Sequence, residues 1–199
     1  MGLISNGTTL LDAGALDSGV TTGSLVLLST LNISNAATAS FASGITSTYK
    51  EYIIKFYNVH PADDDADLTV NFRDGSSAYD APKTSTFFWA YHDEGDTTTQ
   101  FGYASSNDLA NGTGIQPISS NPGSDNDQGC SGTLHLFDPA NTTFVKHFIA
   151  TTNSTEPANY SINSYAAGYC NVTAAIDGVQ FKFESGNIDS GTFKMYGVK

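Results

Sequence analysis

The chain has 199 residues, enough for one large domain, and its composition favours strands, turns and loops. Charged residues make up only 14% and aromatic residues 12%, while Ser, Thr, Asn and Gly are abundant and the usual helix formers are scarce. The net charge of −12 argues against nucleic-acid binding and against anionic membrane surfaces. It fits an acidic exposed surface or carboxylate-rich loops that bind Ca²⁺.

The N-terminal residues 3–11 are predicted to form a short extended arm or edge strand. They do not have the pattern of a signal peptide, because no basic region precedes them and polar residues interrupt the apolar ones. No segment approaches the ~18–20 apolar residues of a membrane span. The apolar residues expected to anchor this arm to a partner are Leu3, Ile4, Leu10 and Leu11.

Short segments of alternating apolar and polar residues follow, separated by turn residues. In 24–33, Leu25, Leu27, Leu31 and Ile33 are expected on one face. Gly168 marks an expected bulge. One helical turn is allowed at 106–110. The predicted strands before the C-terminal stretch cover residues 24–33, 38–42, 49–59, 68–72, 85–92, 132–137, 144–151 and 160–172.

The segment 49–59 is the strongest candidate for a central strand. Tyr52, Ile54 and Phe56 fall on one face, and the other face also carries apolar residues, Tyr57 and Val59 among them. A strand with apolar residues on both faces is expected to meet the core on one side. On the other side it is expected to meet a second layer or a neighbouring subunit. The strand is predicted to end before His60 and Pro61.

The last stretch, residues 175–199, is predicted to form a closing hairpin of two strands. A chain that ends in a well-patterned hairpin has its C-terminus tied into a sheet. The apolar residues expected to face the core are Val179, Phe181, Phe183, Phe193 and Met195.

Together these segments give roughly eight to ten short strands without a helical period, the pattern of an all-β, two-sheet antiparallel sandwich. The simplest such fold is a jelly roll with a short N-terminal arm. Residues 1–199 are predicted to form a single domain in which 1–23 are the arm and a loop. Cys130 and Cys170 are expected to be buried thiols, although one disulfide is also compatible with the sequence.

Candidate chemistry is sparse. Asp63, Asp65 and Asp67 are a weak candidate site for Ca²⁺, but the loop lacks the Gly and the final Glu of an EF-hand, and a solvated turn is the simpler interpretation. No other cofactor is predicted. Nucleophile elbows, phosphate-binding loops and zinc-protease motifs are absent from the sequence, so the chain is predicted not to be an enzyme.

Trp89, Tyr91 and Tyr103 are the candidate contacts for a glycan or a partner protein. Aromatic faces beside acidic hydrogen-bond acceptors are suited to sugar rings. The simpler interpretation, which we favour, is that these residues belong to the sandwich core or to a subunit interface.

Four stretches of the chain resemble virion structural proteins of tailed bacteriophages, especially those of marine bacteria. The last of them is similar to the closing hairpin of jelly-roll domains in phage fibres and capsid ornaments. The resemblance implies an antiparallel sandwich in trimeric or higher assemblies, without catalytic residues. It is carried by ISNGTTLLDAG, TYKEYIIKFYNVHPADD, HLFDPANTTFVKHF and IDGVQFKFESGNIDSGTFKMYGVK.

The sequence therefore predicts a non-enzymatic phage virion protein, most simply a capsid decoration or cement protein that stabilises the particle through subunit contacts. The alternative is a tail-fibre or receptor-binding module that binds carbohydrate. The expected partners are further copies of the chain in a homotrimer and the major capsid or tail proteins, with no nucleic acid and no membrane. The expected location is the virion, assembled in the host cytoplasm.

Overall fold

The computed structural model describes residues 3–5, 7–12, 15–16 and 24–199, and these residues form strands and loops without a helix. A small N-terminal sheet contains β1 (Leu3–Ser5), β2 (Thr8–Asp12) and β3 (Ala15–Leu16). The larger part of the chain forms two further sheets of eight and four strands.

The eight-stranded sheet has the order β4-β15-β6-β11-β12-β13-β8-β9, and all of its neighbours are antiparallel. Its strands are β4 (Leu25–Ala36), β6 (Glu51–Pro61), β8 (Lys83–Asp93), β9 (Thr99–Tyr103), β11 (Gly129–Phe137), β12 (Lys146–Thr155), β13 (Tyr160–Cys170) and β15 (Ile188–Val198). The four-stranded sheet has the antiparallel order β10-β7-β14-β5. Its strands are β5 (Ala39–Phe41), β7 (Leu68–Arg73), β10 (Gln116–Pro117) and β14 (Gly178–Phe183).

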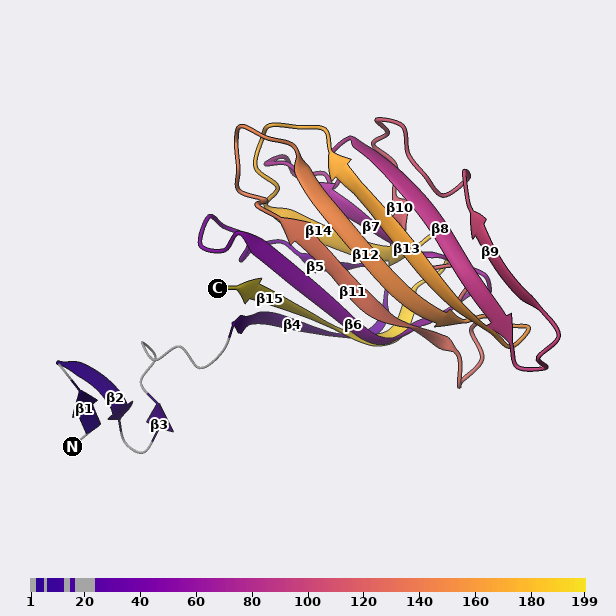
Figure 1. Cartoon of the computed structure of the whole chain (residues 1–199), viewed down its shortest axis with the longest axis horizontal. Helices are drawn as coiled ribbons and strands as arrows, with labels where there is room; N and C mark the ends of the chain where they lie inside the picture. The colour runs from indigo at the N-terminus through magenta and orange to yellow at the C-terminus, as the bar shows by residue number, and fades with distance from the viewer. Residues whose placement is uncertain (1–2, 6, 13–14, 17–23) are drawn as a thin grey trace.

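The four-stranded sheet covers one face of the eight-stranded sheet, as Figure 1 shows. The predicted all-β, two-sheet antiparallel sandwich is therefore confirmed, whereas the jelly-roll type stays a prediction. The helical turn that the sequence allowed at 106–110 does not form, because this segment consists of turns and irregular backbone. Each strand of the four-stranded sheet lies in the chain between two strands of the other sheet, so the chain crosses the core repeatedly.

The last of these crossings corrects the predicted closing hairpin. β14 pairs with β5 and β7 in the four-stranded sheet, while β15 pairs with β4 and β6 in the eight-stranded sheet. The Phe181 and Phe193 rings therefore meet across the core, with centroids 5.0 Å apart. Period-2 alternation predicts the buried residues of both strands but cannot tell which sheet each strand joins. The ordered C-terminal strand is confirmed, because β15 has a partner on each side.

The core lies between the two sheets and is rich in Phe. Phe56 packs against Phe181 with centroids 6.1 Å apart, and Phe72 packs against Phe148 at 5.1 Å. Burying one such side chain contributes about 1.5–3 kcal/mol to folding. The residues that the sequence placed in the core of the C-terminal stretch are all buried, namely Val179, Phe181, Phe183, Phe193 and Met195.

A bulge at Asn58 reverses the sides of β6. Asn58 has a φ of +47°, and the register of β6 shifts here against both β11 and β15. Tyr57 and Asn58 are both exposed, and Val59 is buried. The prediction that Val59 shares a face with Tyr57 is therefore wrong, and the strand continues to Pro61 instead of ending before His60.

A second bulge lies on the edge strand β4. Its register against β15 shifts between Met195 and Tyr196. Leu31 consequently packs against the core, whereas Leu25 and Leu27 are exposed. The prediction of a single apolar face for this strand is wrong because such a shift moves the following side chains to the opposite face.

Gly168 does not form a bulge, because β13 keeps a regular register with both neighbours through this residue. A Cβ atom here would collide with the carbonyl oxygen of Thr84 and lie 2.9 Å from Cζ of Phe148. The glycine therefore serves the close approach of the Phe148 ring.

The N-terminal segment, predicted to be an extended arm or edge strand, forms strands that pair in their own antiparallel sheet. Leu3 pairs with Leu11, Ile4 with Thr9, and Leu11 also with Leu16. Figure 1 shows this sheet to the side of the sandwich. Ile4 is 61% exposed, and its predicted role as an anchor stays a prediction. The side-chain placements of Leu3, Leu10 and Leu11 lie outside the described part of the structure.

Candidate functional site

The uncovered side of the eight-stranded sheet, called the outer face from here on, carries most of the exposed apolar surface. Of the eight large apolar side chains exposed among the described residues, six lie on this face. They are Leu25, Leu27, Tyr57, Phe101, Tyr103 and Ile149. A patch of this kind on a sheet is typical of an interaction surface.

Two of the exposed residues, Leu27 and Ile149, are joined by a row of directly opposite cross-strand neighbours. Leu27 lies opposite Tyr196, which lies opposite Ile53. Ile53 lies opposite His135, and His135 lies opposite Ile149. The row crosses five of the eight strands, from β4 to β12, and His135 is its one polar member.

An aromatic cluster occupies the β8–β9 end of the outer face. The Phe88 and Tyr165 rings are stacked, with centroids 4.9 Å apart and an interplanar angle of 13°. Phe88 also contacts Phe101 at 5.7 Å and lies directly opposite Tyr103. The Tyr103 hydroxyl donates a hydrogen bond to Asp108, and this bond raises the pKa of the phenol.

Two lysines lie directly opposite each other at the β6–β15 side of the outer face. Nζ of Lys55 lies 5.9 Å from the ring centroid of Tyr196, and Nζ of Lys194 lies 5.8 Å from that of Tyr57. Neither lysine forms a salt bridge within the described residues. Because like charges directly opposite each other destabilise a sheet, this pair is suited to an acidic partner.

An aromatic pocket of about 370 Å³ lies on the other side of β8. Trp89 and Tyr91 point to the same side as Phe87, which is buried, yet they are only partly buried, so the cover of the sheet is incomplete here. The pocket is lined by Trp89, Tyr91, Ser120, Asn121, Glu156, Tyr160 and Ile162.

The rings of this pocket have a defined arrangement. Trp89 and Tyr91 are stacked with centroids 5.2 Å apart and an interplanar angle of 22°. Tyr160 stands edge-on to Tyr91 at 5.1 Å and 77°. Gly102 lies opposite Trp89, and a Cβ atom there would be 3.0 Å from Cζ2 of the indole, so a glycine lets the β9 backbone lie against the ring.

The structure therefore brings together two of the three aromatic residues that the sequence singled out. Trp89 and Tyr91 share the pocket, whereas Tyr103 lies on the outer face. Sequence reasoning missed Tyr160, which comes from β13, and Glu156, which precedes that strand. The pairing of β13 with β8 brings Tyr160 to the pocket, and no local pattern reveals this pairing.

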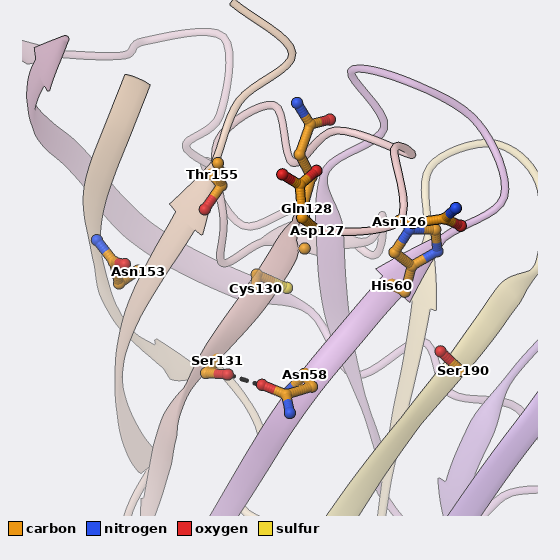
Figure 2. A pocket seen from close by; sticks show the side chains of 11 residues that line it. Asn58, His60, Asn126, Asp127, Gln128, Cys130, Ser131, Asn153, Thr155 and Ser190 are labelled. Carbon is orange, nitrogen blue, oxygen red and sulfur yellow. Dashed lines mark hydrogen bonds between the residues drawn. The ribbon is translucent and has the colours of Figure 1, made fainter. Parts of the chain in front are cut away.

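A polar pocket of about 430 Å³ lies at one end of the eight-stranded sheet, and Figure 2 shows its side chains. The backbone N–H of Asn58 donates to the hydroxyl of Ser131 at 2.9 Å. The lining offers amides, hydroxyls and one carboxylate. It consists of Asn58, His60, Asn126, Asp127, Gln128, Gly129, Cys130, Ser131, Asn153, Thr155 and Ser190.

His60 lines this polar pocket and is held by contacts with two neighbouring residues. Its Nε2 lies 3.0 Å from the carbonyl oxygen of Asp125, which can only accept, so Nε2 carries the proton and donates. Its Nδ1 is buried and lies 3.6 Å from the carboxylate of Asp189. Burial raises the pKa of the Cys130 thiol, so this group is protonated at neutral pH and is a poor nucleophile.

The acidic loop does not assemble into the predicted Ca²⁺ site. Asp67 is buried, where it accepts hydrogen bonds from the backbone N–H of Asn121 at 2.6 Å and from Nδ2 of Asn107 at 2.9 Å. Burial raises its pKa to about 7. Asp63 and Asp65 are exposed. Within the described ranges, no group of three or more His, Cys, Asp or Glu residues could hold a metal ion.

The two cysteines are free and buried, as predicted. Cys170 lies directly opposite both Lys83 and Lys146, which are also buried. Burial lowers the pKa of Lys83 to about 8 and raises that of Cys170 to about 12. Lys83 donates to the side-chain oxygen of Asn71 and to the carbonyl oxygen of Ala81, so its ammonium group is paired within the fold.

Comparison with known proteins gives no relative: no family model matches the sequence, and no curated protein and no solved structure matches the chain. In the part of the chain that the structure describes, no helix is long and apolar enough to cross a membrane.

Proposed function

We propose that this chain is a non-enzymatic structural protein of a phage virion, most simply a capsid decoration or cement protein. In this proposal its sandwich is of the jelly-roll type. Copies of the chain form a homotrimer, and the trimer binds a major capsid or tail protein of the particle. The protein is assembled in the host cytoplasm and acts in the virion through added subunit contacts.

The observation that carries this proposal is the apolar outer face. Six of the eight large apolar side chains exposed among the described residues lie there. Burying them against a partner would remove their apolar surface from water, which favours association. The opposed Lys55 and Lys194 have no carboxylate partner within the described residues, although the chain has 20 acidic residues. A protein surface with carboxylates would complete this face, and further copies of this acidic chain offer such a surface.

The N-terminal sheet supports a second contact in the same proposal. It pairs only its own strands among the described residues and exposes Ile4. Such a sheet can dock on a neighbouring capsid or tail subunit while the outer face joins the copies of the trimer. In the tail-fibre variant of the proposal, the same two surfaces hold an appendage instead of a capsid lattice.

The test is to locate the chain in phage particles purified from a host that makes it during infection. Peptide mass spectrometry of the particles should detect the chain in many copies per virion, and cryo-electron microscopy should place the sandwich on the capsid. Density on the tail would favour the fibre variant. Absence of the chain from intact, infectious particles would overturn the proposal.

A further inference from the structure

We propose that the aromatic pocket around Trp89 binds a neutral saccharide. This function goes beyond the assembly role and does not depend on it, because the pocket lies on the side of β8 opposite the outer face. The proposed ligand is a short oligosaccharide without charged groups.

The rings give the pocket a stacking surface. Trp89 and Tyr91 are nearly parallel, with an interplanar angle of 22°, and Tyr160 stands at 77° to Tyr91 as a side wall. The face of a pyranose ring that carries C–H groups packs on such aromatic surfaces, while its hydroxyl groups point to the rim. The volume of about 370 Å³ is within the range of small-ligand sites.

Polar groups at the rim are held in place by the fold. Oε2 of Glu156 accepts the backbone N–H of Ala158 at 3.0 Å, which leaves Oε1 for a ligand. Asn121 has a φ of +44°, and its backbone N–H is bound by the buried carboxylate of Asp67. The amide side chain of Asn121 makes no hydrogen bond within the described residues and is free for a ligand. A carboxylate and an amide that line the same pocket can accept from and donate to the hydroxyl groups of one sugar ring.

The charge of the lining selects against anionic ligands. The lining residues include Glu156 and no Lys, Arg or His, and the chain carries a net charge of −12. Phosphorylated, sulfated and carboxylated sugars are therefore disfavoured. A proline-rich peptide can also stack on aromatic side chains. Proline residues, however, have no N–H to donate to Glu156. Sugar hydroxyl groups can donate their O–H to this carboxylate, and this difference favours the saccharide.

The sequence contains a single tryptophan, so the fluorescence of the protein reports on this pocket directly. The experiment is a screen of the full chain on an array of neutral oligosaccharides of glucose, galactose, mannose and N-acetylglucosamine. The best binders are then titrated while tryptophan emission is recorded, with a proline-rich peptide and a sialylated oligosaccharide as comparison ligands.

Two rim variants keep the tryptophan and suit the local backbone. Glu156→Gln keeps an oxygen for the N–H of Ala158, and Asn121→Gly tolerates the φ of +44°. Glu156→Gln and Asn121→Gly should each weaken binding about tenfold through the loss of one hydrogen bond to the ligand. The control is Tyr103→Ala, which removes an aromatic ring from the opposite face of the same sheet and should leave binding unchanged. Thermal unfolding of all three variants verifies that they are folded.

The inference is supported by a saturable emission change with a neutral oligosaccharide that is lost in the two rim variants and kept in Tyr103→Ala. It is overturned if no oligosaccharide changes the emission up to millimolar concentration, or if binding persists in both rim variants. Tighter binding of the proline-rich peptide or of the sialylated ligand also overturns it. None of these outcomes depends on whether the chain is found in virions, so failure here is distinct from failure of the assembly role.

Discussion

The two faces of the eight-stranded sheet are built from neighbouring residues of the same strands, yet they have opposite environments. On β6, Ile54 and Phe56 point inward and are at most 1% exposed, whereas Tyr57 points outward and is 40% exposed. On β12, Phe148 is fully buried and Ile149 is 48% exposed. The four-stranded sheet covers the inner face, and no element of the described chain covers the outer one (Figure 1).

The contrast separates two groups of apolar residues on this sheet. The inner residues stabilise the isolated fold. The outer residues stay exposed in the single chain, and a patch of exposed apolar side chains is typical of an interaction surface. The Trp89 pocket marks the boundary between these cases, because its rings belong to the inner face but lie where the cover is incomplete.

The largest expected difference between the faces comes from adjacent residues of β12. Phe148→Ala should lower the free energy of unfolding by about 3–5 kcal/mol, because it removes the ring's contacts with Phe72 and Gly168 and leaves a cavity. Ile149→Ala should change it by no more than about 0.5 kcal/mol when the chain is dilute and monomeric. Urea unfolding at low protein concentration measures both values. Equal losses in the two variants would show that the outer face is already covered within one chain.

A smaller effect is expected from the buried carboxylate of Asp67, which directly precedes β7. The pKa of Asp67 is raised from 3.8 to about 7 in the fold, so the folded state holds its proton more tightly than the unfolded state. The stability that this group contributes is therefore complete below pH 4 and is lost as the pH rises to about 7. The loss has an upper bound of about 4 kcal/mol.

The variant Asp67→Asn tests this effect. It should be more stable than the wild type at pH 8, and the difference should shrink as the pH falls towards 4. Thermal or urea unfolding at several pH values measures it. A difference that is independent of pH would contradict the raised pKa.

The alternation of residues predicted much of the inner face, because period 2 is a local property. The alternation failed where a bulge shifts the register of a strand or where the chain passes to the other sheet. Asn58 reverses the faces of β6, and only the tolerance of Asn for positive φ could have signalled it. The hairpin was wrong because Phe181 and Phe193 show the same pattern whether their strands share a sheet or face each other.

The candidate site was predictable to the same extent. Trp89 and Tyr91 are two residues apart on one strand, so the pattern alone put them on one side. Asn121, Glu156 and Tyr160 come from distant loops and from β13. They meet the rings only through pairing between strands, which depends on tertiary structure.

The smallest expected effect concerns the opposed lysines of the outer face. Lys194→Glu would place a carboxylate opposite Lys55 and should raise the free energy of unfolding by about 0.2–1 kcal/mol. The isolated chain would then be less stable with the Lys55–Lys194 pair than with a lysine–glutamate pair at the same positions. Destabilisation by this variant at low concentration would show that the repulsion is already relieved within one chain.

The central claim, that the outer face is an assembly interface, is tested most directly by the molar mass of the chain in solution. Light scattering after size exclusion should give three times 21.0 kDa for the wild type at high micromolar concentration. The double variant Phe101→Glu and Ile149→Glu should give 21.0 kDa, while Phe144→Glu, which alters an exposed aromatic residue outside this sheet, should remain a trimer. A monomeric wild type, or a trimer that survives the double substitution, would contradict the account.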